Sequence, residues 1–467
     1  MGYPRSTLSV RTDTADELSV RHLSSLSRGS VRMACCAAGI AVIFLGGCRL
    51  GESTAGKRGI STPGAGPSLT VMAMTEGSNA KFENDVLHEF AGAGGYQIRY
   101  LPYLGSNNEC LEMYRQLFEE RSSQPDICDI DIIWPAILAN DLVDLTPYLG
   151  ADIKAFPPEL IESFTIGGRL VALPTYLDTG LLYYRSDLLR KYGFRKPPAT
   201  WDELGRMASI IQAGERRAGK RDFWGFVWQG EAGEGLTCDA LEWQSSEGGG
   251  HIIEPDGTIR VYNPAAIHAL ERAVSWIGAI SPPGVVSYGE DDSLNVWQSG
   301  NAAFMRGWLY GYGSMRDPSC SVHDRFGVAL LPGGPGGRSR VLGDMAVAVS
   351  KYSKHRAEAV AAIRNLTSAR NEAMRARQAG SVPTRLMLQN RLDVMDQTPF
   401  SGLLAQDVLT GIVARPSVIT GRSYEAVSRA YYTAIHAALT RQETPREALA
   451  GLEKQLVQIT GRQPSRN

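Results

Sequence analysis

Short apolar runs alternate with amphipathic segments along the first third of the chain's body. Residues 69–74, 96–103 and 127–133 are dense in apolar side chains, as buried strands are. Apolar residues at helical spacing begin near Ser78 and again near Leu111, so a helix is expected after each of the first two strands. This order predicts an α/β lobe with a parallel sheet, in which ligands bind beyond the carboxyl ends of the strands.

Residues 173–192, LPTYLDTGLLYYRSDLLRKY, mark the place where we expect the chain to divide. Tyr176 and Asp178 precede a small-residue break at positions 179–180, and an apolar strand at 181–184 follows it. Such a break suits a passage of the chain between two lobes, and ligand sites favour domain interfaces. We therefore expect Tyr176 and Asp178 to line a cleft, although a surface acid in a loop would explain Asp178 equally well.

Three more places carry side chains suited to a ligand rich in hydroxyl groups. Asp131 interrupts the apolar third strand, where a buried acid is costly unless it has a bonding partner, so we expect it to line the site. The alternative is that it caps the next helix. Trp308, Tyr310 and Tyr312 crowd a glycine-rich stretch, which is a poor pattern for a core, so they would stack on sugar rings or pack their own loop. Arg415 precedes a proline and would donate a fork of hydrogen bonds to a ligand, or lie on the surface.

The N-terminal region has the pattern of a secretory leader. Residues 33–45 are apolar or small and follow two arginines, which describes a signal segment too short to span a bilayer. They end in Leu-Gly-Gly-Cys48, which resembles the lipobox of bacterial lipoproteins and implies a lipid on Cys48. We assign residues 1–48 to the leader and signal and 49–67 to a flexible tether. A generic signal peptide with a chance cysteine is the alternative, and the true start codon stays open.

Length and charge narrow the class of protein. A chain of 467 residues predicts two or three domains, and a net charge of −1 gives no reason to expect nucleic acid or an anionic membrane surface as a partner. Cys110, Cys128, Cys238 and Cys320 lack metal-ligand spacing, so no metal or cofactor is expected. They suggest buried free thiols, although a Cys110–Cys128 disulfide stays open. The glycines at 229–236 lack the context of a phosphate loop and indicate a loop before a helix.

Four passages together resemble the sugar-binding proteins of bacterial and archaeal ABC importers, specifically the trehalose/maltose-binding branch. They are LPTYLDTGLLYYRSDLLRKYG, DFWGFVWQGEAGEGLTCDALEW, WQSGNAAFMRGWLYGYG and ARPSVITGRSYEAVS, and the resemblance extends over nearly the whole chain after the tether. It implies an α/β fold of two lobes joined by a hinge with a cleft between them. Crossings are expected near 177–180, 330–331 and 382–384. The first lobe would hold residues 68–178 and 331–383, the second 179–330 and 384–467.

The resemblance also implies a set of sugar-contacting residues. Carried over position by position, they are Asp131, Tyr176, Asp178, Glu234, Gly235, Trp308, Tyr310, Gly343, Asp344, Met345 and Arg415. Three positions depart from the branch: Ala80 replaces a ligand-binding glutamate, Met345 replaces a stacking tryptophan, and Glu109 or Cys110 replaces an arginine. The resemblance implies a disaccharide such as trehalose or maltose. Because of the three departures, a related oligosaccharide or glycoside is the other expectation.

These expectations describe a binding protein and not an enzyme. It would be a monomer, held by the lipid on Cys48 outside the cytoplasmic membrane, that delivers sugar to the permease subunits of an ABC importer. A secreted glycoside hydrolase is the rival, because two carboxylates beside aromatics also describe that chemistry. A sugar-sensing or adhesion module of the same fold is the third possibility.

Overall fold

The first sheet has five strands, and its order places the ends of three of them side by side. The order is β2 (Gln97–Tyr100), β1 (Ser68–Met72), β3 (Ile127–Asp131), β12 (Met345–Val349) and β6 (Leu173–Tyr176). Strand β1 pairs in parallel with β2 and β3, whereas β12 runs antiparallel between β3 and β6. The predicted parallel arrangement of the first three strands is confirmed. Because β12 is reversed, its first residue lies beside the carboxyl ends of β3 and β6.

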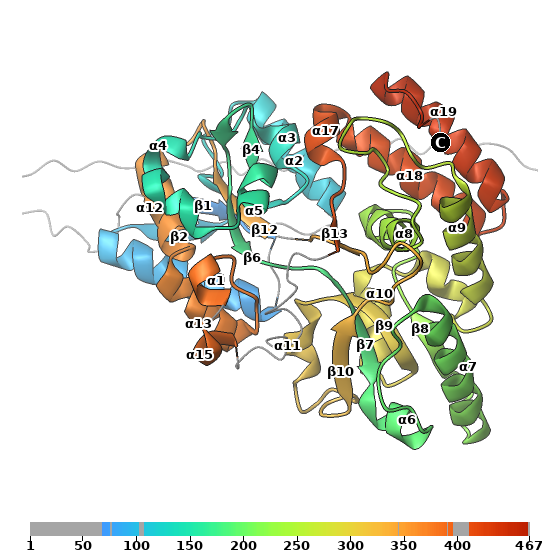
Figure 1. Cartoon of the computed structure of the whole chain (residues 1–467). Helices are drawn as coiled ribbons and strands as arrows, with labels where there is room; N and C mark the ends of the chain where they lie inside the picture. The colour runs from blue at the N-terminus through green and yellow to red at the C-terminus, as the bar shows by residue number, and fades with distance from the viewer. Residues whose placement is uncertain are drawn as a thin grey trace, which may run out of the picture. The chain divides into compact units, whose positions relative to one another are not determined.

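Helices cover this sheet to form what we call the first lobe. They are α1 (Gly77–Gly94), α2 (Asn107–Glu119), α12 (Arg356–Leu366) and α13 (Ala369–Ala379), and α1 packs against both α12 and α13. Figure 1 shows α1, α12 and α13, which are distant in sequence, beside one another. The lobe's buried side chains include Leu69, Phe82 and Ile130, which the apolar pattern places on core-facing positions.

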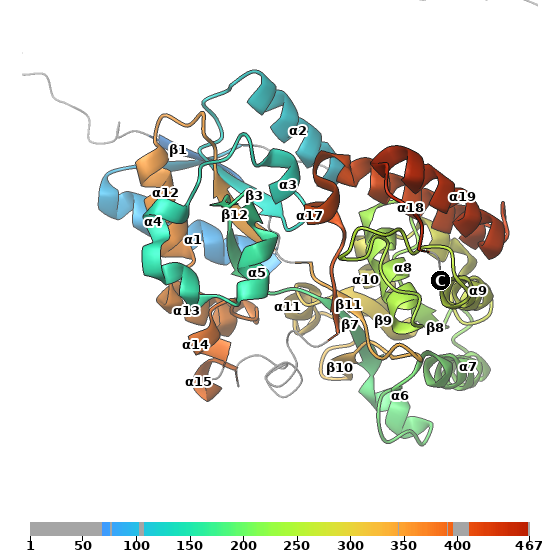
Figure 2. The same ribbon diagram turned by 45° about the horizontal axis from the view of Figure 1, so that its top comes forward.

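The second sheet has four strands, in the order β10 (Phe326–Leu330), β7 (Gly180–Arg185), β9 (Ala302–Trp308) and β8 (Trp224–Val227). Both faces of β7 are buried, because Leu181 and Leu182 belong to different core clusters. Helices complete the second lobe: α7 (Trp201–Arg217), α8 (Glu234–Ser246), α9 (Pro264–Trp276), α10 (Glu290–Gln298), α18 (Tyr424–Leu439) and α19 (Pro445–Thr460). Helix α18 packs against α8, α9 and α19 (Figure 2).

Local capping fixes where the long helices of the second lobe begin. The Thr200 side chain accepts a hydrogen bond from the backbone N–H of Glu203, and Thr444 and Glu447 form a full capping box before α19. The remaining helices and strands are short: α3 (Pro135–Leu138), α4 (Thr146–Leu149), α5 (Pro158–Ser163), β4 (Thr165–Ile166), β5 (Arg169–Leu170), α6 (Ser186–Lys191), α11 (Gly311–Met315), β11 (Arg340–Val341), α14 (Leu386–Gln389), α15 (Leu392–Met395), β13 (Ile412–Val413) and α17 (Ser417–Thr420).

The three stretches where passages between the lobes are expected, 177–180, 330–331 and 382–384, lie in different surroundings. The first passage follows β6 at Leu177–Thr179. Residues after Leu331 still bond to the second lobe, since the N–H of Gly333 donates to Ala199 O, so the second passage follows β11. Helices α14 and α15, which follow 382–384, pack against α13 or each other. Val382 instead bridges to Leu177 of the first passage.

This structure is a computed structural model, and it describes residues 68–74, 77–101, 107–343, 345–389, 391–395 and 411–465. These described residues form one compact unit. The leader, the tether, the lipidation candidate Cys48 and the contact candidate Asp344 lie outside the described residues. Cys110 and Cys128, whose pairing the sequence left open, are free and buried. In the described segments we find no helix with the length and apolar character needed to cross a membrane.

Candidate functional site

A cavity of about 590 Å³ opens where strand ends of both sheets face each other. The first sheet contributes the ends of β3 and β6, the start of β12, and Met74 just after β1. The second contributes the loops after β8 and β9. The cavity is lined by Met74, Asp131, Tyr176, Asp178, Gln229, Glu231, Ala232, Gly233, Glu234, Gly235, Leu236, Cys238, Tyr288, Gly289, Glu290, Asp291, Asp292, Trp308, Tyr310, Gly343, Met345 and Arg415.

Every contact residue expected from the sequence lines this one cavity, apart from Asp344, which is not described. The alternative readings of two of them are wrong. Asp178 is 3 % exposed and Arg415 is 7 % exposed, so neither is a surface charge. Asp131 combines both of its readings: it faces the cavity, and its Oδ1 accepts from the N–H of Ile133 at 3.1 Å, which caps the turn after β3.

Arg415 ties the two walls of the cavity together. Its Nη2 donates to Asp131 Oδ1 at 3.3 Å and to the carbonyl of Leu342 at 3.0 Å, while Nη1 donates to Glu234 Oε1 at 2.9 Å. Glu234 also accepts from the Tyr424 hydroxyl and, at 2.6 Å, from the Ser428 hydroxyl. Charge-assisted bonds of this kind are strong when buried. The guanidinium therefore links β3 of the first lobe to α8 of the second.

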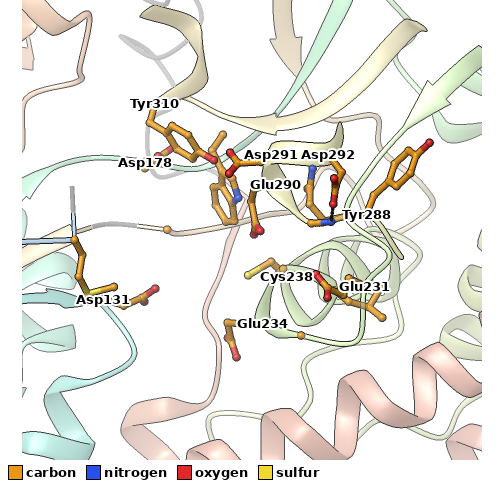
Figure 3. A pocket seen from close by; sticks show the side chains of 18 of the residues that line it. Asp131, Asp178, Glu231, Glu234, Cys238, Tyr288, Glu290, Asp291, Asp292 and Tyr310 are labelled. Carbon is orange, nitrogen blue, oxygen red and sulfur yellow. Dashed lines mark hydrogen bonds between the residues drawn. The ribbon is translucent and has the colours of Figure 1, made fainter. Parts of the chain in front are cut away.

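Asp178 fixes the loop that carries the aromatic residues. Its Oδ1 accepts from the backbone N–H groups of Thr179 at 2.7 Å and Leu309 at 2.8 Å. Burial raises the pKa of this carboxyl to about 7, and the backbone N–H donors counteract part of that rise. Asp178 thus positions Trp308 and Tyr310 from the first passage between the lobes. Figure 3 shows Asp178 beside Tyr310, with Asp131 on the opposite side of the space from Glu290.

Trp308 and Tyr176 supply aromatic surface on the two walls. Trp308 is the last residue of β9, and the Arg306 guanidinium carbon lies 3.9 Å from the centre of its ring. Tyr176 ends β6 and is 5 % exposed, with the Arg375 guanidinium carbon 5.5 Å from its ring centre. Aromatic side chains can cover the C–H faces of a sugar, and both cavity aromatics rest on a buried arginine.

Several lining residues were missed by the sequence reasoning. The missed set comprises Met74, Gln229, Glu231, Ala232, Gly233, Leu236, Cys238, Tyr288, Gly289, Glu290, Asp291 and Asp292. The loop at 229–233 follows β8, so its position at the carboxyl end of a strand was a usable signal. The acids at 290–292 begin α10, where a favourable helix dipole already explains them, so they gave no distinct signal.

The cavity is rich in acids. Among its described lining residues Arg415 is the one basic side chain. Burial raises the pKa of Glu290, while Arg306 and Trp308 act in the opposite direction. Burial likewise raises the pKa of Asp131, and the charge of Arg415 counteracts it. No group of three or more His, Cys, Asp or Glu side chains with the arrangement of a metal site occurs in the described residues.

The chain belongs to the family of bacterial extracellular solute-binding proteins, whose model matches residues 82–373. A probable ABC transporter-binding protein of Deinococcus radiodurans is 45 % identical to it over 354 residues, which cover 75 % of this chain and 84 % of the relative.

Solved structures support the same fold. Maltose-bound MalE3 of T. maritima superposes with a TM-score of 0.78 at 34 % identity, covering 84 % of this chain and 99 % of that chain. A solute-binding protein of Thermotoga lettingae bound to α-D-tagatose has a TM-score of 0.73 at 22 % identity, over 85 % and 100 % of the two chains, which bears on the fold alone. The predicted two-lobed fold of a sugar-importer binding protein is confirmed.

Proposed function

We propose that this chain captures a sugar in the cavity between its lobes and presents it to the permease of an ABC importer. The observation that carries the proposal is the lining of the cavity: both walls supply aromatic rings and carboxylates, together with one buried arginine. Rings suit the apolar faces of a sugar, and carboxylates accept hydrogen bonds from its hydroxyl groups. The maltose ligand of the 34 % identical T. maritima protein supports this class of ligand.

Binding would work by closure of the two lobes. A sugar that touches Asp131 and Tyr176 on one wall and Trp308 on the other gains contacts in the closed arrangement that an open one lacks. A ligand shifts such an equilibrium by its difference in affinity for the two states. The passages between the lobes, which begin with Leu177–Thr179, would serve as the hinge.

The particular sugar follows less directly than the class. The T. maritima protein binds maltose, but this chain has Met345 and Ala80 at positions where the trehalose/maltose-binding branch has a stacking and an accepting group. We propose a disaccharide such as maltose or trehalose, or a related oligosaccharide or glycoside.

Anchoring completes the proposal. A lipid on Cys48 and the tether at 49–67 would hold a monomer at the outer face of the cytoplasmic membrane or in the periplasm, within reach of the permease. Expression with a radiolabelled fatty acid tests this point: label should enter the wild type and be lost in Cys48→Ser. Equal labelling of the two proteins would remove the anchor from the proposal.

Calorimetric titration of the purified protein with a panel of mono-, di- and oligosaccharides tests the function itself. We expect at least one panel member to bind with an affinity in the micromolar range or tighter and to shift the thermal unfolding midpoint upward. The absence of binding across the panel would contradict the proposal. Turnover of a glycoside substrate by the same sample would favour the hydrolase alternative.

A further inference from the structure

The backbone that carries Trp308 is fixed on both sides of the ring. The carbonyl of Trp308 accepts from the Tyr183 hydroxyl at 2.6 Å, and the next N–H, of Leu309, donates to Asp178 at 2.8 Å. Trp308 also pairs in register with Gly180 of the neighbouring strand. Because the backbone at Trp308 is held in place, the orientation of the ring depends on the groups that surround it.

One face of the ring lies against a buried and fully engaged cation. Arg306, two residues earlier on β9, points to the same side of the sheet as Trp308. Its guanidinium is 0 % exposed and donates to Glu242 through Nε at 3.0 Å and Nη2 at 2.8 Å, and to Gln229 through Nη1 at 3.1 Å. An ion pair with Asp239 at 2.9 Å completes its contacts. Because the guanidinium cannot rotate, the ring stacked on it has a fixed support.

The edge of the Trp308 ring occupies space that a side chain at position 343 would fill. A β-carbon added to Gly343 would lie 2.5 Å from Cζ3 of Trp308 and 2.9 Å from Cε3, far inside the ordinary carbon–carbon contact distance. The backbone of Gly343 is not in the left-handed region, and the three heavy atoms nearest to the added carbon all belong to the Trp308 ring. The N–H of Gly343 donates to the Asp178 carbonyl at 2.9 Å, which keeps this backbone from moving aside.

We infer that Arg306 and Gly343 are positioning residues for Trp308: Arg306 supports the ring as a flat surface, and Gly343 leaves the space that sets its tilt. This inference rests on the proposed function, because the surface acts on a sugar in the cavity. It extends that function by naming two groups that control how the aromatic surface meets the ligand, although only Gly343 lines the cavity.

A double-mutant cycle between Gly343→Ala and Trp308→Phe tests the inference with a sugar that the wild type binds. The alanine should weaken binding about tenfold when Trp308 is present, as expected for an overpacked contact. It should change binding less than about twofold in the Trp308→Phe background, because the smaller ring does not reach the added methyl group. Gly205→Ala, in α7 with open space around its added carbon, is the control for a glycine-to-alanine change.

A second readout does not depend on any sugar. Subtracting the near-ultraviolet circular dichroism spectrum of the Trp308→Phe variant from that of the wild type isolates the signal of the Trp308 indole. The same subtraction made with Gly343→Ala present in both proteins should give a different spectrum. Arg306→Lys, which keeps a positive charge beside Glu242, should alter it as well. An unchanged difference spectrum, or an equal loss of affinity from Gly343→Ala in both backgrounds, would overturn the inference. A wild type that binds no sugar would instead contradict the proposed function and leave the spectral test in force.

Discussion

The two walls of the cavity differ in how completely their supporting polar groups are satisfied. On the second-lobe wall, Arg306 beneath Trp308 bonds to Glu242 and Gln229 and pairs with Asp239. On the first-lobe wall, Arg375 beneath Tyr176 is as deeply buried, at 1 % exposed. Its nearest acid is Glu83 at 3.8 Å, and its guanidinium nitrogens make no hydrogen bond within the described part of the chain.

This difference indicates that the walls are prepared for a ligand to different degrees. A satisfied network holds its groups in one arrangement before the ligand arrives, which lowers the cost of binding. The first-lobe wall also carries Met74 and Met345, whose unbranched side chains adapt to irregular surfaces. We therefore expect the second-lobe wall to supply most of the affinity and the first-lobe wall to adapt to the shape of the sugar.

The largest expected effect comes from removing the two supporting arginines. Arg306→Met leaves Glu242 and Asp239 buried without their cation and should lower the free energy of unfolding by about 3–5 kcal/mol. Arg375→Met removes no hydrogen bond seen in the described residues, but it leaves the buried Glu83 without its ion-pair partner at 3.8 Å. It should therefore cost less than Arg306→Met, about 1–3 kcal/mol. Urea unfolding of the ligand-free proteins, followed by circular dichroism, measures both.

Arg377 provides the control for this pair. It lies on α13 with Arg375 but is 45 % exposed, paired with Asp393 at 3.0 Å. Arg377→Met should change stability by roughly 0.5 kcal/mol or less. Equal losses for the Arg306 and Arg375 variants would remove the contrast between the walls.

A second test concerns Asp178, which joins the walls from the first passage. Its pKa is raised from 3.8 to about 7 by burial. The folded state therefore holds a proton on Asp178 that the unfolded state releases near pH 4. The stability that this proton contributes to the folded state is fully present below pH 4 and is lost as the pH rises to about 7. Between pH 4 and 7 it lowers stability by at most about 1.4 kcal/mol per pH unit.

Asp178→Asn keeps an oxygen for the N–H groups of Thr179 and Leu309 but does not titrate. Urea unfolding of both proteins from pH 4.5 to 8 should show a steeper decline in the wild type below pH 7. Parallel curves would mean that Asp178 is ionised throughout and that its N–H donors outweigh burial. Glu372→Gln is a useful comparison, because burial raises the pKa of Glu372 to about 7 as well, away from the cavity.

Much of this architecture was accessible from the sequence because local patterns carried it. The apolar runs predicted the first three strands of the first sheet, β1, β2 and β3. Val382 pairs with Leu177 while the chain after it still packs on α13, an arrangement that local patterns do not reveal. The proximity of Arg306 to Trp308 follows from strand spacing, but the network that holds Arg306 and the closeness of Gly343 to the ring join residues far apart in the chain, so local patterns could not reveal them.

A third test compares the ligand contacts of the two walls directly. Trp308→Ala should weaken sugar binding by ~2 kcal/mol, about thirtyfold, because it removes a supported aromatic surface. Met345→Ala on the opposite wall should weaken it by less than about 1 kcal/mol, since neighbouring flexible groups can take up part of the lost contact. Calorimetry at one temperature gives both values. A larger loss for Met345 than for Trp308 would reverse the assignment of the walls.

The smallest expected effect lies at an edge of the contact between the lobes, away from the residues that line the cavity, where Arg115 of α2 meets Glu425 of α18 at 2.6 Å. This ion pair links the lobes, as Arg415 does inside the cavity, but its side chains are 31 % and 26 % exposed. Partly exposed pairs contribute about 0–1 kcal/mol and weaken with salt. Arg115→Ala should therefore change the sugar dissociation constant less than about fourfold, and the change should shrink further between about 0.05 and 0.5 M sodium chloride. A tenfold change in the dissociation constant that persists at high salt would mean that the Arg115–Glu425 pair also controls closure of the lobes. The hydrogen-bonded network beneath Trp308 would then not determine affinity alone.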